Sequence, residues 1–111
     1  MEMTMTQLGS GVAILKPVGR LNMVSAPHFK EGVTMALGQG ATRIVVDLSE
    51  VDFMDSSGLG AIINGLKSAR EAGGDLRLAA VSWQAKLVLS LTNMDQVLVL
   101  HDDARTAFTD V

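Results

Sequence analysis

The chain has 111 residues, of which 48% are hydrophobic and 19% charged, and its formal net charge is −3 at pH 7. This size and apolar content predict one domain over residues 1–111, and they exclude a two-domain chain and an intrinsically disordered one. The charges are scattered, with neither a basic patch for nucleic acid nor a run of about eighteen apolar residues for a membrane span. We therefore expect no nucleic-acid partner, no membrane insertion and a cytoplasmic location.

Residue types that commonly bind metals or carry catalysis are scarce. The sequence has no cysteine and only two histidines, His28 and His101, which lie far apart in the chain. Two such histidines do not form a pair with metal-ligand spacing. We expect no disulfide, no metal site and no resident cofactor.

The first two strands are predicted to form a hairpin. Residues 4–8 and 12–18 are strand candidates on either side of the turn Gly9-Ser10-Gly11, and turns of three such residues commonly close a β-hairpin. Pro17 cannot donate a ladder hydrogen bond, so we expect it at the end or edge of a strand.

A helix is predicted next, because the apolar period changes from two to 3.6. Ser25 is the expected N-cap, Pro27 fits the first turn, and Gly38 is placed to end the helix. The residues expected on its inward face are Ala26, Phe29, Val33, Ala36 and Leu37.

Residues 43–48 are apolar on both faces for most of their length, which predicts a central strand covered on both sides. The chain then runs through residues 49–54, where no strand is predicted, into a second helix that Gly73-Gly74 ends. The inward face of that helix is expected to comprise Leu59, Ile62, Ile63 and Leu66.

The remaining chain predicts a strand at residues 76–81, a third helix capped by Ser82, and a short last strand at residues 97–100. Trp83 is expected to be a partly buried anchor of the third helix, although a Trp at a helix start can also lie in an interface. The expected inward residues of this helix are Leu87, Val88 and Leu91.

Asp102-Asp103 suit the start of a terminal helix that ends near Phe108, since acidic groups favour a helix N-terminus. Strands that alternate with helices imply right-handed crossovers and parallel pairing. The predicted fold is an α/β domain with a mixed, mostly parallel sheet of four to five strands, an N-terminal hairpin and about four helices.

The segment Asp55-Ser56-Ser57-Gly58-Leu59-Gly60 is the most informative part of the sequence. It places two hydroxyls at a strand-to-helix connection, where open α/β sheets display ligands and reactive groups. The dipole and free N–H groups of a helix start would favour an anion on a serine there, and the two glycines would let a partner's backbone approach. Helix capping alone is the more common explanation of such a turn.

Two enzyme interpretations of this segment fail. A nucleophile elbow requires G-x-S-x-G, but Met54 occupies the position of the first glycine when the motif is centred on Ser56. The phosphate-binding motif G-x-x-x-x-G-K-[ST] is absent, and Lys67 lies outside the glycine turn. We predict that the chain is not an enzyme and has no catalytic residue.

The stretch Phe53 to Gly60, preceded by residues 44–48 and followed by an apolar helix and residues 73–76, resembles the STAS domain of bacterial anti-sigma factor antagonists. The resemblance extends over essentially the whole chain. It implies that the unmodified domain binds an anti-sigma factor serine kinase and frees the sigma factor. It also implies that the kinase phosphorylates Ser56 with its own ATP and that a serine phosphatase of the metal-dependent type reverses this.

The resemblance further implies a partner-binding surface made of Asn22, Asp55, Ser56, Ser57, Gly58 and Leu59. Many members carry an acidic residue where this chain has Asn22, close to the phosphorylated serine. Asparagine keeps the hydrogen-bonding shape and loses the charge. An alternative function is that of a STAS regulatory subunit in a signalling, biofilm or lipid-transport complex.

Overall fold

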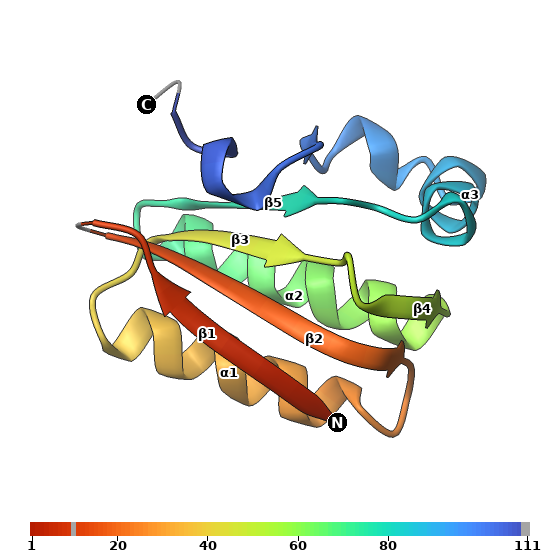
Figure 1. Cartoon of the computed structure of the whole chain (residues 1–111), viewed down its shortest axis with the longest axis horizontal. Helices are drawn as coiled ribbons and strands as arrows, with labels where there is room; N and C mark the ends of the chain where they lie inside the picture. The colour runs from red at the N-terminus through yellow and green to blue at the C-terminus, as the bar shows by residue number, and fades with distance from the viewer. Residues whose placement is uncertain (10, 110–111) are drawn as a thin grey trace.

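A mixed sheet forms the centre of the computed structural model, which describes residues 1–9 and 11–109 (Figure 1). Ser10 of the predicted turn lies outside the described residues. The sheet order is β1-β2-β3-β5-β6, and β4 pairs with β2 outside this path. The strands are β1 (Glu2–Gln7), β2 (Val12–Leu21), β3 (Arg43–Asp47), β4 (Val51–Met54), β5 (Asp75–Ala79) and β6 (Leu100–His101).

The helices in the described part of the chain are α1 (Ala26–Gly38), α2 (Ser56–Glu71) and α3 (Trp83–Leu91), with two short 3-10 helices, η1 (Met94–Gln96) and η2 (Ala104–Thr106). The predicted α/β class and mixed sheet are confirmed. The predicted strand and helix counts are wrong, because the sheet has six strands and the terminal helix is only the 3-10 turn η2. No helix among these residues is long and apolar enough to cross a membrane.

Strand β2 changes its parallel partner halfway along its length. Its first half pairs with β3, from Val12 opposite Arg43 onward, and its second half pairs with β4 up to Leu21 opposite Met54. Pro17 lies between these two halves, opposite Met3 of antiparallel β1. Pro17 is therefore inside a strand rather than at its end. No parallel strand in the described part of the chain pairs with β2 at this point, so no parallel neighbour requires a hydrogen bond from the N–H that proline lacks.

Strand β4 was not predicted from the sequence. It has only four residues, and its two buried side chains, Val51 and Met54, are separated by two exposed ones. This pattern lacks the alternation that identifies a half-buried strand. Pairing with β2 nevertheless brings the carboxyl ends of β2 and β4 side by side.

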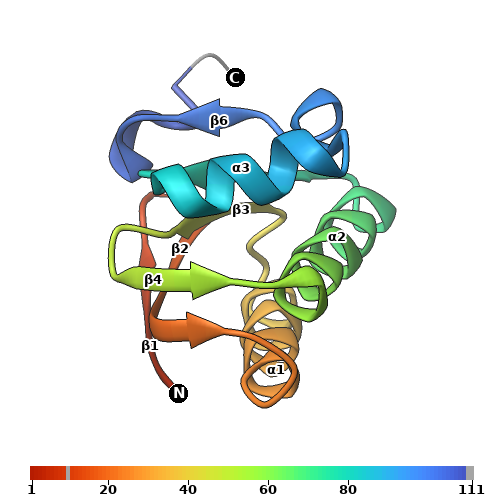
Figure 2. The ribbon, with the colours of Figure 1, turned by 90° about the vertical axis from the view of Figure 1, so that its right-hand side faces the viewer.

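Helices α1 and α2 pack on one face of the sheet, as Figure 2 shows. Alternate residues of β3 divide between the two faces: Ile44 and Val46 join the main core under the helices, and Val45 joins a smaller cluster on the other face. The C-terminal segment covers that cluster with Phe108, whose ring lies 4.5 Å from the Arg77 guanidinium. The prediction that this strand is covered on both sides is thus confirmed.

The predicted orientation of the third helix is wrong. Ala85 and Leu89 are buried and Val88 packs against the core, whereas Trp83, Leu87 and Leu91 are exposed. Six of the nine residues of this helix are apolar, so the sequence pattern does not single out one inward face. The last strand is also displaced, to Leu100–His101.

Candidate functional site

The carboxyl ends of β2 and β4 lead directly into the two connections that form the candidate site. Asp55 follows β4 and is the N-cap of α2; its Oδ1 accepts a hydrogen bond of 3.0 Å from the Gly58 backbone N–H. The Asp55 N–H in turn donates to the Leu21 carbonyl at 3.3 Å. Asp55 therefore fixes the start of α2 against the end of β2, as the capping interpretation of the sequence requires.

Gly58 is buried against β2 and does not line an open surface. A Cβ at this position would overlap the Leu21 carbonyl oxygen and would lie 2.8 Å from the carbonyl carbon. Gly60, by contrast, is exposed, and nothing lies within 4 Å of the position its Cβ would take. Of the two glycines expected to admit a partner, only Gly60 borders free space.

The two serines of the segment differ in accessibility. Ser56 is the first residue of α2 and is exposed, and its hydroxyl has no hydrogen-bond partner among the described residues. Ser57 is half-buried and lines a shallow hollow of about 410 Å³ between the starts of α1 and α2. Leu59 is buried in the core. Ser56 is thus the more exposed of the two hydroxyl-bearing residues.

Asn22 shapes the neighbouring connection between β2 and α1. Its Oδ1 accepts hydrogen bonds from the backbone N–H groups of Val24 at 3.0 Å and Ser25 at 3.2 Å. Ser25, predicted to be the N-cap of α1, makes no side-chain capping bond; its Oγ instead donates to the Arg20 carbonyl at 2.7 Å. Ser25 is at the N-cap of α1 as predicted, but its side chain does not cap the helix, and Asn22 supports the turn that precedes it.

Replacing Asn22 separates its support of this turn from the charge at the position. Asn22→Ala removes the acceptor for two backbone N–H groups and should cost about 1 kcal/mol in the free energy of unfolding. Asn22→Asp keeps that acceptor and should stay within about 0.5 kcal/mol of the wild type. Urea denaturation of both variants measures the difference. If the aspartate variant were as unstable as the alanine variant, Oδ1 would not support this turn.

The β2–α1 connection and strand β4, which lead into the site, expose apolar side chains to an extent that the sequence does not reveal. Met23 and Val24, in the β2–α1 connection, are 73% and 85% exposed. Phe53 on β4 is also exposed, with the Arg20 guanidinium 5.6 Å from its ring centre. Because exposure here depends on how the turn is held, residue type alone could not have identified these side chains.

Gln84 links α3 to the same surface. Its Oε1 accepts from the Met54 N–H at 2.9 Å, and its Nε2 donates to the Met54 carbonyl at 2.8 Å. The side-chain amide thus pairs with the free edge of β4 as a neighbouring strand would. No local sequence signal could have predicted a contact between residues thirty positions apart.

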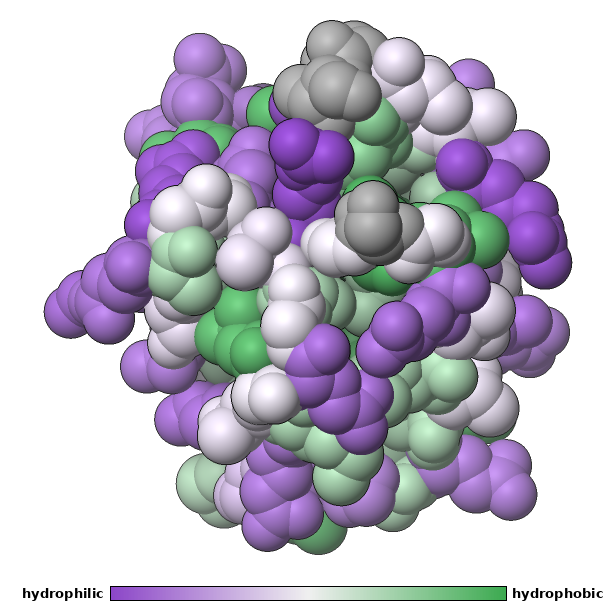
Figure 3. Space-filling model, turned by 90° about the vertical axis from the view of Figure 1, so that its left-hand side faces the viewer, coloured by the Kyte–Doolittle hydropathy of each residue, from purple (hydrophilic) through white to green (hydrophobic). Residues whose placement is uncertain are grey.

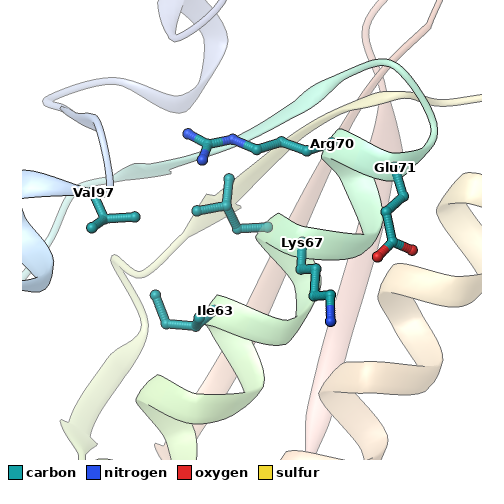
Figure 4. Close-up of a pocket in the computed structure, with 6 residues that line it drawn as sticks. Ile63, Lys67, Arg70, Glu71 and Val97 are labelled. Atoms are coloured by element: carbon teal, nitrogen blue, oxygen red, sulfur yellow. The ribbon is translucent and has the colours of Figure 1, made fainter.

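A second hollow, of about 430 Å³, lies along the C-terminal half of α2. Ile63, Leu66 and Val97 form its apolar floor, with Lys67 and Arg70 nearby (Figure 4). Arg70 Nε lies 3.5 Å from a carboxylate oxygen of Asp75. None of the residues predicted for the partner-binding surface lines this hollow, so it is separate from the candidate site.

Comparisons with known proteins give consistent results. Residues 4–107 match the family model of the STAS domain. A Thermotoga maritima protein described as a "putative anti-sigma factor antagonist" is 38% identical over 101 residues, which cover 90% of this chain and 89% of that protein. A crystal structure of a Thermotoga maritima protein with the same description has a TM-score of 0.88 at 34% identity, covering 98% of this chain and 93% of that one.

A structure of the Bacillus cell fate determinant SpoIIAA in its phosphorylated form has a TM-score of 0.75. It is 19% identical in sequence and covers 98% of this chain and 97% of that one. At this identity the likeness shows a shared fold.

Proposed function

This chain belongs to the STAS domain family, and on that premise we propose that it is an anti-sigma factor antagonist switched by phosphorylation of Ser56. The unmodified protein binds an anti-sigma factor serine kinase in the cytoplasm and so releases the sigma factor. Phosphorylation on Ser56 ends this binding, and a metal-dependent serine phosphatase restores it. The names of the similar proteins support the antagonist function.

The observation that carries the proposal is the position of Ser56. Its hydroxyl is exposed at the first residue of α2, directly after the Asp55 cap and beside the connection held by Asn22. The N–H groups and dipole of the helix start stabilise an anion at this position. A phosphate can therefore be added without loss of the fold.

The same phosphate is unfavourable in an interface. It adds a charge of about −1.5 to −2 at neutral pH, immediately after the Asp55 carboxylate and next to Ser57, which lines a hollow together with Met23. A partner that covers this surface removes water from the phosphate, and the start of α2 offsets only part of its charge. A loss of about 1.4 kcal/mol already weakens binding tenfold.

The proposed contact surface consists of residues with two different tasks. Asn22, Asp55, Ser56 and Ser57 reach or approach the surface. Gly58 and Leu59 lie beneath it and determine its shape, because Gly58 allows α2 to begin against Leu21.

The kinase supplies ATP: the Ser56 oxygen takes the γ-phosphoryl group and ADP leaves. The phosphatase then transfers that group to water, which gives inorganic phosphate.

Phosphate mapping tests the assignment of Ser56. After incubation with the cognate kinase and ATP, mass spectrometry should find one phosphate per chain, on Ser56. Ser57→Ala is the matched control and should still be phosphorylated, whereas Ser56→Ala should not. A phosphate on Ser57, or one that persists in Ser56→Ala, would contradict the assignment.

A further inference from the structure

A hollow of about 150 Å³ between β1 and α1 brings together thioether and imidazole side chains. The two elements lie side by side at one edge of the sheet (Figure 1). Three of the chain's seven methionines line this β1–α1 hollow, together with one of its two histidines. These four residues are Met3, Met5, Met35 and His28. The proposed function uses none of them.

The backbone of each element places these residues on the side of the hollow. Met3 and Met5 are two positions apart on β1, so they lie on the same face of the strand, and both pack against the core. On α1, His28, Gly32 and Met35 are spaced by four and three residues and so lie along one stripe of the helix. The strand face and the helix stripe line the same hollow.

Gly32 makes room for a sulfur at the centre of this arrangement. A Cβ at Gly32 would overlap the Met3 methyl carbon and would lie 3.3 Å from the Met3 Sδ. Cβ positions three or four residues apart on a helix are separated by about 5–6 Å, so His28 and Met35 leave α1 about one turn to either side of that sulfur. The Met3 sulfur therefore lies within reach of an imidazole on one side and of a second thioether on the other.

Packing alone does not explain the whole set. Met3 and Met5 fill the space between β1 and α1, a task that leucine performs equally well. Met35, however, is 57% exposed, and His28 is exposed too. The side of the molecule at the left of Figure 1 shows polar and apolar residues interspersed (Figure 3). The concentration of thioethers is thus a local feature of the β1–α1 hollow.

The charge and the ligand types of the hollow favour a soft cation. Among the described residues that line it, Glu31 is the one with a formal charge, and that charge is negative. Mg²⁺, Ca²⁺ and Zn²⁺ are bound by carboxylate, imidazole or thiolate groups. In the described part of the chain, no three His, Asp or Glu side chains form a group that could hold such an ion.

We propose that Met3, Met5, Met35 and His28 bind one Cu⁺ ion. Thioether sulfur is a soft ligand that selects Cu⁺, and imidazole is also a good ligand for copper. Methionine has three rotatable side-chain bonds, so its sulfur can turn onto the ion while the backbone stays in place. The absence of cysteine and the separation of the two histidines, on which the expectation of no metal site depends, do not exclude a thioether site. The ion binds as Cu⁺ without electron transfer, and the site is independent of phosphorylation.

Competition for Cu⁺ with the chromogenic chelator bicinchoninate, under reducing and anaerobic conditions, tests the proposal on the purified chain. The wild type should take up one Cu⁺ per chain. Met3→Leu and Met5→Leu keep the side-chain volume and lose the sulfur, and each should weaken Cu⁺ binding at least tenfold, as should His28→Gln. Met94→Leu is the matched control, because Met94 is also partly buried against the core, and it should bind like the wild type.

NMR of the methionine methyl groups in the wild type gives a second readout that does not depend on how the variants fold. One equivalent of Cu⁺ should shift the methyl signals of Met3, Met5 and Met35 and leave those of Met23 and Met94 in place. The same amount of Zn²⁺ should shift none of them. A wild type that takes up no Cu⁺, leucine variants that bind as tightly as the wild type, or equal shifts at all five methionines would overturn the proposal.

Discussion

Gly58→Ala is expected to destabilise the protein by about 3 kcal/mol or more, the effect of forcing an atom into a fully packed position. The added Cβ would meet the backbone carbonyl of Leu21, which a side-chain rotation cannot relieve. Leu21 also accepts the hydrogen bond from Asp55 and pairs with Met54 in the sheet. Relief of the overlap would therefore move the start of α2 away from the position that presents Ser56.

Gly60→Ala is the matched control for this prediction. It lies two residues further along the same helix, where a Cβ meets no atom within 4 Å. Alanine is a better helix former than glycine, so this variant should gain about 0.5 to 1 kcal/mol. Urea unfolding measures both changes. Equal effects at the two positions would show that the contact between Gly58 and Leu21 does not decide the stability of this turn.

Ser56→Asp is expected to weaken binding of the anti-sigma factor kinase at least tenfold. The substitution places a permanent negative charge next to Asp55, where the partner must cover the surface. The helix start tolerates the charge, so the variant should unfold at nearly the same urea concentration as the wild type. Calorimetric titration with the kinase gives the dissociation constants.

Ser56→Asn isolates the role of charge in this result, because asparagine has nearly the shape of aspartate and no net charge. It should bind the kinase more tightly than Ser56→Asp does, and Ser56→Ala should bind about as well as the wild type. Equal weakening by asparagine and aspartate would mean that side-chain size, and not charge, determines the loss of binding.

Elements with one strong local pattern were predictable from the sequence. The apolar run that became β3 and the periodic apolar face of α2 appear as expected, and the Asp55 cap follows from the ordinary preference for aspartate before a helix. In each case the neighbouring residues alone contain the information. The segment that presents Ser56 could be located for the same reason.

The features that were missed depend on contacts distant in sequence. Strand β4 exists because β2 continues beyond β3 and offers it an edge. Ser25 is at the N-cap of α1 as predicted, but its hydroxyl bonds to the Arg20 carbonyl, five residues back, and Asn22 supports the turn before the helix. The face that α3 buries is likewise fixed by the bonds between Gln84 and Met54.

The most direct test of the proposed switch compares one preparation of the protein before and after phosphorylation on Ser56. Its dissociation constant for the anti-sigma factor kinase is measured by calorimetry in both states, and again after treatment with a serine phosphatase. We predict binding at least tenfold weaker in the phosphorylated state and full recovery after dephosphorylation. Equal affinity of the two states would contradict the proposal that phosphorylation of Ser56 controls partner binding.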